Sequence, residues 1–194
     1  MGNQKQLQIF RRSTRLERDG TGEGLSGYIP TPRGLELLGQ LLDALASNDY
    51  KAFSVTGPYG SGKSSFAVFL SALFEPRTSS AHQAALSLLE AESGPMARSV
   101  QAMRERFSVG ETGFVVVKVT AQRAPLLAIL RDALASALGQ LADLSDLQER
   151  VRGLLATEPM EERVLVKALQ AICDECPVLL CLDEFGKALE WFSE

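Results

Sequence analysis

Eight consecutive residues have the types and spacing needed to bind a phosphate group. Residues 57–64 match the pattern G-x-x-x-x-G-K-[ST] at every fixed position. Glycines let the backbone turn sharply and present N–H groups to phosphate oxygens. Lys63 supplies a positive charge for the β- and γ-phosphates, and Ser64 supplies a hydroxyl ligand for Mg²⁺. The predicted phosphate-binding residues are Gly57, Pro58, Tyr59, Gly60, Ser61, Gly62, Lys63, Ser64 and Ser65.

The residues on both sides of this loop favour the same interpretation. Residues 52–56 are typical of a short buried strand. After the loop, apolar residues recur at helical spacing and predict a helix that ends before Pro76. The positive end of that helix, near Lys63, would point at the bound anion. A chance turn of glycines and serines is therefore a poor explanation of the pattern.

A second group of residues could hold a metal ion and activate water. Residues 178–182 form a continuous apolar run, typical of a buried parallel strand, and Asp183 and Glu184 follow directly. Asp183 would hold Mg²⁺ at the tip of the strand, and Glu184 would orient and deprotonate the attacking water. Alone, this pair is an ordinary acidic turn after a core strand. With the phosphate loop present, it indicates a catalytic site.

The remaining pattern alternates strands and helices, and therefore predicts an α/β fold with a parallel sheet. Residues 114–120 predict a strand, and Ser145 with Gln148 predicts a capping box at the start of a helix. Further helices are expected at 31–46, 81–91 and 97–107, and after Pro125 and Pro159.

The two motifs together resemble the P-loop ATPases of the ASCE division, most closely the AAA+/STAND group, over residues 28–74 and 178–186. The resemblance implies a three-layer P-loop NTPase fold with a parallel sheet. It also implies an ATPase that uses ATP and Mg²⁺ and acts as a motor or switch. The site residues implied are catalytic Lys63 and Glu184, metal ligands Ser64 and Asp183, and adenine contacts from Tyr28, Ile29, Pro30 and Arg33. The sequence from Leu182 to Lys187 is also similar to bacterial phage-defence and DNA-processing ATPases.

The resemblance also predicts a domain organisation. Residues 1–27 are expected to be a flexible, basic and glycine-rich arm, and residues 28–194 an ATPase domain with helical insertions around 77–112 and 143–174. In such ATPases a further strand separates the phosphate-loop strand from the acidic strand. Because the sequence ends soon after Asp183, we expect an incomplete sheet, the N-terminal part of a longer ATPase, and a fragment that need not hydrolyse ATP alone. Direct pairing of residues 52–56 with 178–182 would contradict this class.

Charge and hydropathy limit the possible partners. The chain has 20 Lys and Arg against 24 Asp and Glu, a net charge of −4, which excludes a globally basic nucleic-acid coat. Arg11, Arg12, Arg15 and Arg18 leave two interpretations open, a mobile or partner-dependent terminus and a contact to DNA phosphates. The sequence contains neither a membrane-spanning run nor a signal peptide, so we expect a cytoplasmic protein without a membrane partner, working in an oligomer or multi-protein complex.

Some alternatives remain. The same loop fits a nucleotide-dependent scaffold or signalling protein with little turnover. A small-molecule kinase and a GTPase are disfavoured, because the acid pair suits water activation and no guanine-reading motif follows it. Cys173, Cys176 and Cys181 are interpreted as structural. His82 is expected to be a solvent-facing helix residue.

Overall fold

The computed structural model describes residues 16, 23–25, 27–47, 51–141 and 143–191 of the 194. Most of these residues are helical. The elements in chain order are η1 (Glu23–Leu25), α2 (Pro32–Ser47), α3 (Lys63–Phe74), α4 (Ser80–Glu92), α5 (Gly94–Arg106), β1 (Val115–Thr120), α6 (Leu126–Ala137), η2 (Leu138–Leu141), α7 (Ser145–Leu155), α8 (Glu162–Cys173), β2 (Val178–Asp183) and α9 (Phe185–Glu190).

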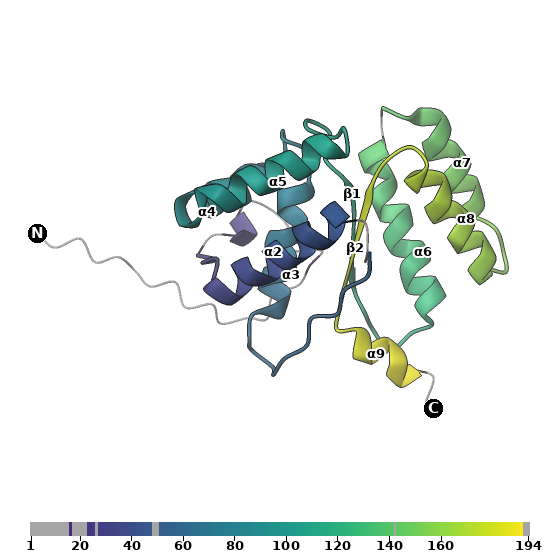
Figure 1. The fold of residues 1–194 in the computed structure, drawn as a ribbon. Coiled ribbons are helices and arrows are strands. Elements are labelled where there is room, and N and C mark those ends of the chain that lie inside the picture. Colours follow the sequence, from purple (N-terminus) through teal and green to yellow (C-terminus); the bar gives the residue numbers. More distant parts are fainter. Residues whose placement is uncertain (1–15, 17–22, 26, 48–50, 142, 192–194) are drawn as a thin grey trace, which may run out of the picture.

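The described residues form one sheet of two parallel strands, β1 and β2. Val115 lies opposite Val178 at the start of the ladder, and Thr120 lies opposite Asp183 at its end. The parallel register brings the carboxyl ends of both strands to the same end of the molecule, next to α9 (Figure 1). Both strands match the sequence prediction to within one residue at each end.

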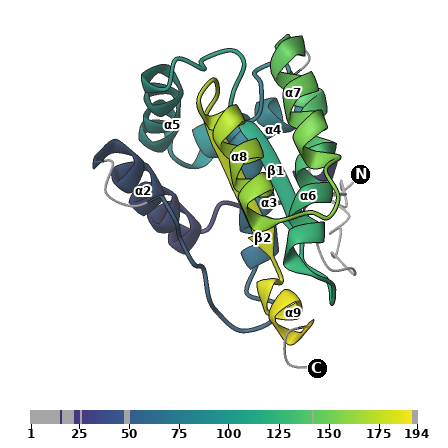
Figure 2. The same ribbon diagram turned by 90° about the vertical axis from the view of Figure 1, so that its right-hand side faces the viewer.

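Helices cover both faces of this ribbon (Figures 1 and 2). One hydrophobic cluster gathers side chains of α2 to α5 against Val116 and Cys181. The other gathers side chains of α6, η2, α7 and α8 against Val115, Val117 and Val119. Successive strand residues therefore face opposite clusters, as the period of two requires. Leu16 and Leu25 are also buried in the first cluster.

The expected three-layer P-loop core is not formed, so the predicted fold class is wrong. Residues 52–56 are not a strand, and every residue from 51 to 62 is exposed. No backbone hydrogen bond among the described residues joins 52–56 to β2, which pairs with β1 alone. A strand needs a hydrogen-bonded neighbour to be stable, and without one Phe53 and Val55 are left 46% and 41% exposed.

Among the described helices, none combines the length and hydropathy needed to cross a membrane.

Local hydrogen bonds explain where the helices begin. The Thr31 hydroxyl accepts the N–H of Gly34 at 3.1 Å and caps α2, as the sequence predicts. Ser79 and Ser93 cap α4 and α5 in the same way. The capping box predicted at Ser145 is wrong, because that residue already lies inside α7 and no side chain caps the helix.

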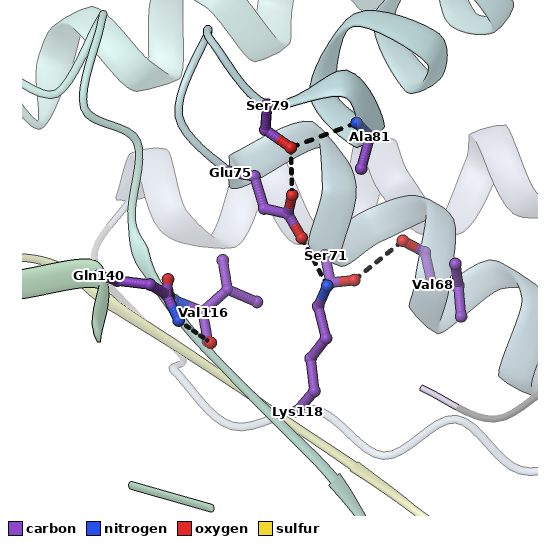
Figure 3. A network of polar contacts seen from close by, with 8 residues as sticks. All are labelled: Val68, Ser71, Glu75, Ser79, Ala81, Val116, Lys118 and Gln140. Carbon is purple, nitrogen blue, oxygen red and sulfur yellow. Dashed lines mark hydrogen bonds and ion pairs between the residues drawn. The ribbon is translucent and has the colours of Figure 1, made fainter. Parts of the chain in front are cut away.

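A polar network joins the end of α3 to β1 (Figure 3). The Lys118 ammonium pairs with Glu75 at 2.5 Å, and Glu75 also accepts a hydrogen bond from the Ser79 hydroxyl. The side-chain amide of Gln140, in η2, accepts a hydrogen bond from the backbone N–H of Val116 on β1 at 2.9 Å and donates one to the Val116 carbonyl at 2.8 Å. A cavity of about 320 Å³ lies beside these residues. Because Glu75 follows the last turn of α3, this cavity is at the opposite end of the helix from Lys63.

Candidate functional site

The phosphate-loop motif adopts a turn that glycine makes possible. Gly60 and Gly62 have φ angles of 78° and 84°, in the left-handed region. A Cβ added at either position would meet no atom within 4 Å, so backbone conformation rather than space explains the need for glycine here. The carbonyl of Gly62 accepts the N–H of Phe66 at 2.8 Å, and α3 begins at Lys63. The motif thus leads from an exposed loop into a helix N-terminus.

The Lys63 side chain folds back over this loop. Its ammonium donates to the carbonyl oxygens of Gly57 at 3.0 Å and Pro58 at 2.8 Å, and lies 3.5 Å from the Ser61 hydroxyl. These contacts are with neutral acceptors, since no acidic residue pairs with Lys63 among the described residues. The ammonium is therefore held over the loop with its charge uncompensated, which suits an anion.

The two predicted acids stand where β2 passes into α9. The Asp183 carbonyl accepts the N–H of Ala121 at 2.9 Å, which fixes the end of β2 against the segment after β1. One oxygen of the Asp183 carboxylate accepts the N–H of Glu184 at 2.9 Å. Glu184 has a φ of 54° and occupies the N-cap position of α9, and its carboxylate is ion-paired with Lys187. A left-handed backbone is uncommon for a residue other than glycine, so this turn is strained.

The loop and the acids lie at the same end of the molecule. Helix α3 runs antiparallel to β1 and β2, so its first residue, Lys63, lies at the end where Asp183 terminates β2 (Figures 1 and 2). Helix α3 also contacts β2. Residues 120 positions apart in the sequence are thus brought to the same end of the fold, where Glu184 is ion-paired with Lys187.

The residues expected to contact adenine lie around the start of α2. Tyr28 packs its ring on Phe69 of α3 with the ring centroids 4.8 Å apart, and burial raises the pKa of Tyr28 to about 12. Ile29 is 71% exposed and offers an apolar surface. Arg33 forms an ion pair of 2.6 Å with Glu36, one turn along the same helix. Tyr28 therefore joins the core, whereas Ile29 is open to a ligand.

The predicted metal ligands are hard oxygen donors. Mg²⁺ prefers such donors and keeps several of its waters, so a hydroxyl and one carboxylate are a sufficient protein contribution. Ser64 in the first turn of α3 and Asp183 at the tip of β2 provide that pair, and they fit the ion in donor type. The described residues contain no cluster of three or more His, Cys, Asp or Glu side chains with metal-binding geometry.

Two charged residues at this end were not assigned a role from the sequence. Lys187 contacts Glu184 three residues away on α9, a spacing that itself predicts an ion pair on a helix. Arg123, in the segment after β1, pairs with Glu190 of α9 at 2.8 Å. That contact spans 67 residues, and no local pattern could have indicated it.

The structure also tests the predictions for His82 and for Cys181. His82 is buried rather than solvent-facing, because its Nδ1 hydrogen-bonds the Leu73 carbonyl at 3.1 Å, so that expectation is wrong. Cys181 is buried in β2 as predicted, and burial raises its pKa to about 11. Burial also raises the pKa of Cys173 and of Cys176. The arginines considered for DNA contact, residues 11, 12, 15 and 18, lie outside the described residues.

Comparison with known proteins finds no match for this chain among protein-family models, curated proteins or solved structures.

Proposed function

We propose that this chain binds ATP with Mg²⁺ and hydrolyses it, acting as a motor or switch of the AAA+/STAND type. The observation that carries the proposal is the placement of the two motifs at the same end of the fold. The glycine turn ending at Lys63 starts α3 where Asp183 and Glu184 end β2. Parallel strands commonly hold ligands at their carboxyl ends, and Asp183 and Glu184 follow the carboxyl end of β2.

The loop supplies the groups that a triphosphate requires. Residues 57–62 are exposed, and the backbone N–H groups of such a loop, with the N-terminus of α3, favour an anion. Lys63 exchanges its contacts with the carbonyls of Gly57 and Pro58 for the β- and γ-phosphate oxygens. This exchange replaces neutral acceptors by charged ones, and charge-assisted hydrogen bonds are about twice as strong.

The acids supply metal binding and water activation. The Ser64 hydroxyl and the Asp183 carboxylate would hold Mg²⁺, which neutralises phosphate charge when bound. Glu184 accepts a proton from a water molecule, while the water oxygen bonds to the γ-phosphorus. The bond from that phosphorus to the bridging oxygen breaks, and ADP and phosphate leave. Ile29, with Tyr28 and Arg33 beside it, is proposed to contact the adenine.

The biological setting follows from the resemblance. The sequence from Leu182 to Lys187 is similar to bacterial ATPases of phage defence and DNA processing, so we place the activity in a cytoplasmic, DNA-associated or antiviral assembly. DNA is a candidate partner because arginine residues recur near the N-terminus. The acidic net charge argues against strong binding of DNA by this chain alone.

One observation favours a second candidate, a nucleotide-dependent scaffold with little turnover. The carboxylate of Glu184 is engaged by Lys187, and a base held in this way turns over substrate slowly. Both candidates share ATP binding at residues 57–64, and they differ in whether ATP is cleaved.

The test separates binding from cleavage. The full chain is titrated with a fluorescent ATP analogue in the presence of Mg²⁺, and phosphate release is then followed over many turnovers, with and without DNA. Binding with sustained release supports the ATPase, and binding with at most one turnover supports the scaffold. A chain that fails to bind the analogue at millimolar concentration contradicts both.

A further inference from the structure

Helix α9 carries a basic residue directly against the proposed base. The Lys187 ammonium contacts one oxygen of the Glu184 carboxylate, and the Lys187 N–H donates to the Glu184 carbonyl at 2.9 Å. Both bonds close the first turn of α9 on the residue that precedes it. An ammonium in this position competes with water for the carboxylate oxygens that must accept a proton.

The position of Lys187 is fixed by the anchoring of α9. Ala188, the next residue, is fully buried and attaches one face of the helix to the fold. At the far end of α9, Glu190 pairs with Arg123 of the segment after β1 at 2.8 Å. At the near end, the Asp183 carbonyl accepts the Ala121 N–H. The helix is therefore attached at both ends, which keeps Lys187 within reach of Glu184 without support from any ligand.

We propose that Lys187 is a positioning residue that holds Glu184 on α9 and thereby slows ATP hydrolysis, so that the basal rate is set by release of this ion pair. The proposal rests on the function proposed above and adds a regulatory element to the same site. Glu184 acts on water only while Lys187 is released. A partner that moves α9, for instance by separating Arg123 from Glu190, would therefore raise the rate.

Exposure sets the size of the effect. The side chains of Lys187 and Glu184 are 51% and 39% exposed, so solvent screens the pair. Exposed pairs of this kind bias an equilibrium by a modest factor, and removal of the lysine should raise the hydrolysis rate about two- to fivefold. A pair of this strength opens spontaneously, which makes it suitable as a reversible brake rather than a permanent block.

The experiment uses the full chain and five variants. Lys187→Met removes the ammonium and keeps the length of the side chain, while Lys187→Arg keeps the charge. Glu184→Gln removes the base, and the double variant combines it with Lys187→Met. Lys167→Met, at an exposed position of α8, is the matched control for loss of a surface lysine. Nucleotide affinity, kcat and KM for ATP are measured for each, with urea denaturation as a check that each variant is folded.

We expect Lys187→Met to raise kcat about two- to fivefold with KM and nucleotide affinity unchanged, and Lys187→Arg to restore the low rate. In the Glu184→Gln background, Lys187→Met should have no effect, because the two residues act through one contact. The Lys167→Met control should match the parent chain. A change in folding alone would not raise kcat or be reversed by arginine.

The proposal is overturned if Lys187→Met leaves kcat unchanged or lowers it, or if the same increase appears in the Glu184→Gln background. Failure of the proposed function can be distinguished from failure of this proposal by the behaviour of the parent chain. A parent chain that does not bind ATP refutes the nucleotide site, and the brake with it. A parent chain that binds ATP, but whose rate is indifferent to Lys187, refutes the brake alone.

Discussion

The buried guanidinium of Arg104 donates a hydrogen bond of 3.0 Å to the carbonyl oxygen of Leu73, in the last turn of α3. The same group donates to the carbonyls of Glu75 at 2.8 Å and Gly110 at 3.1 Å. A helix leaves its last carbonyl oxygens without partners inside the helix, and these must be satisfied when they are buried. One side chain of α5 thus completes the C-terminus of the helix that begins at Lys63.

Replacing Arg104 by methionine should therefore be strongly destabilising. The change removes the Arg104 donor from the carbonyls of Glu75 and Gly110, and leaves the Leu73 carbonyl with its contact to His82 alone. The free energy of unfolding should therefore fall by about 2–5 kcal/mol. Urea denaturation followed by circular dichroism measures the loss. Arg104→Lys, which keeps the charge but offers a different donor geometry, should lose less. A loss below about 0.5 kcal/mol for the methionine variant would show that these carbonyls find other partners.

His82 should make stability depend on pH. Burial lowers the pKa of His82, and the charge of Arg104 lowers it further. In the unfolded chain the imidazole has its ordinary pKa of about 6.5 and takes up a proton that the folded state refuses. The contribution of neutral His82 to the free energy of unfolding is therefore present above about pH 6.5. It is lost as the pH falls below that value, with a slope of at most about 1.4 kcal/mol per pH unit.

The measurement for His82 is the unfolding free energy between pH 5 and pH 8. The His82→Asn variant keeps a side-chain N–H near the Leu73 carbonyl but does not titrate, so its stability should vary less over the same range. Equal pH dependence of the variant and the parent would assign the effect to another group.

Lys63→Ala should weaken nucleotide binding at least about tenfold. The ammonium is the only cation bound to the loop among the described residues, and a charged hydrogen bond to phosphate is worth a factor of at least about ten in affinity. Fluorescence titration with an ATP analogue measures the loss, and Lys167→Ala serves as a control for charge. Retention of the parent affinity would place the phosphate elsewhere.

Glu184→Gln should bind ATP but cleave it slowly. Glutamine keeps the size of the side chain and cannot accept the proton from water, so the rate should fall by at least about a hundredfold while affinity stays within a few fold. Single-turnover phosphate release in excess protein tests this directly. If the variant cleaves ATP as fast as the parent chain, the base is a different residue.

Gly62→Ala should damage the loop, whereas Gly153→Ala should stabilise the chain. Gly62 has a left-handed φ of 84°, which costs alanine about 1–2 kcal/mol, and the strained turn should also weaken ATP binding. Gly153 lies exposed within α7 with open space around its missing Cβ, so alanine should add about 0.5–1 kcal/mol. Thermal unfolding of the two variants should therefore shift in opposite directions.

Elements with strong local signals could be predicted from the sequence. Helix α2 begins after Thr31, whose hydroxyl caps it as expected, and β1 and β2 follow their runs of apolar residues. Residues 52–56 show the limit of this method. Their residue types favour a short buried strand, but strand formation depends on a hydrogen-bonded neighbour, and a local pattern carries no information about whether one is present.

The candidate site divides in the same way. The turn at Gly60 and Gly62 could be predicted from the sequence motif, because both residues adopt a left-handed backbone that favours glycine. Contacts such as that of Arg123 with Glu190 depend on how distant segments pack, and so they could be found only in three dimensions. The prediction for His82 was wrong for a related reason, because its hydrogen-bond partner is a carbonyl of another helix, α3.

The side chain of Gln140 has a consequence for self-association. Its amide offers one donor and one acceptor to Val116, as a peptide group of an adjacent strand would. A foreign chain that approached this margin of β1 would have to displace the amide before it could pair with Val116. The glutamine side chain therefore covers the free edge of β1 at Val116, and it protects the protein at that point against edge-to-edge pairing into fibrils.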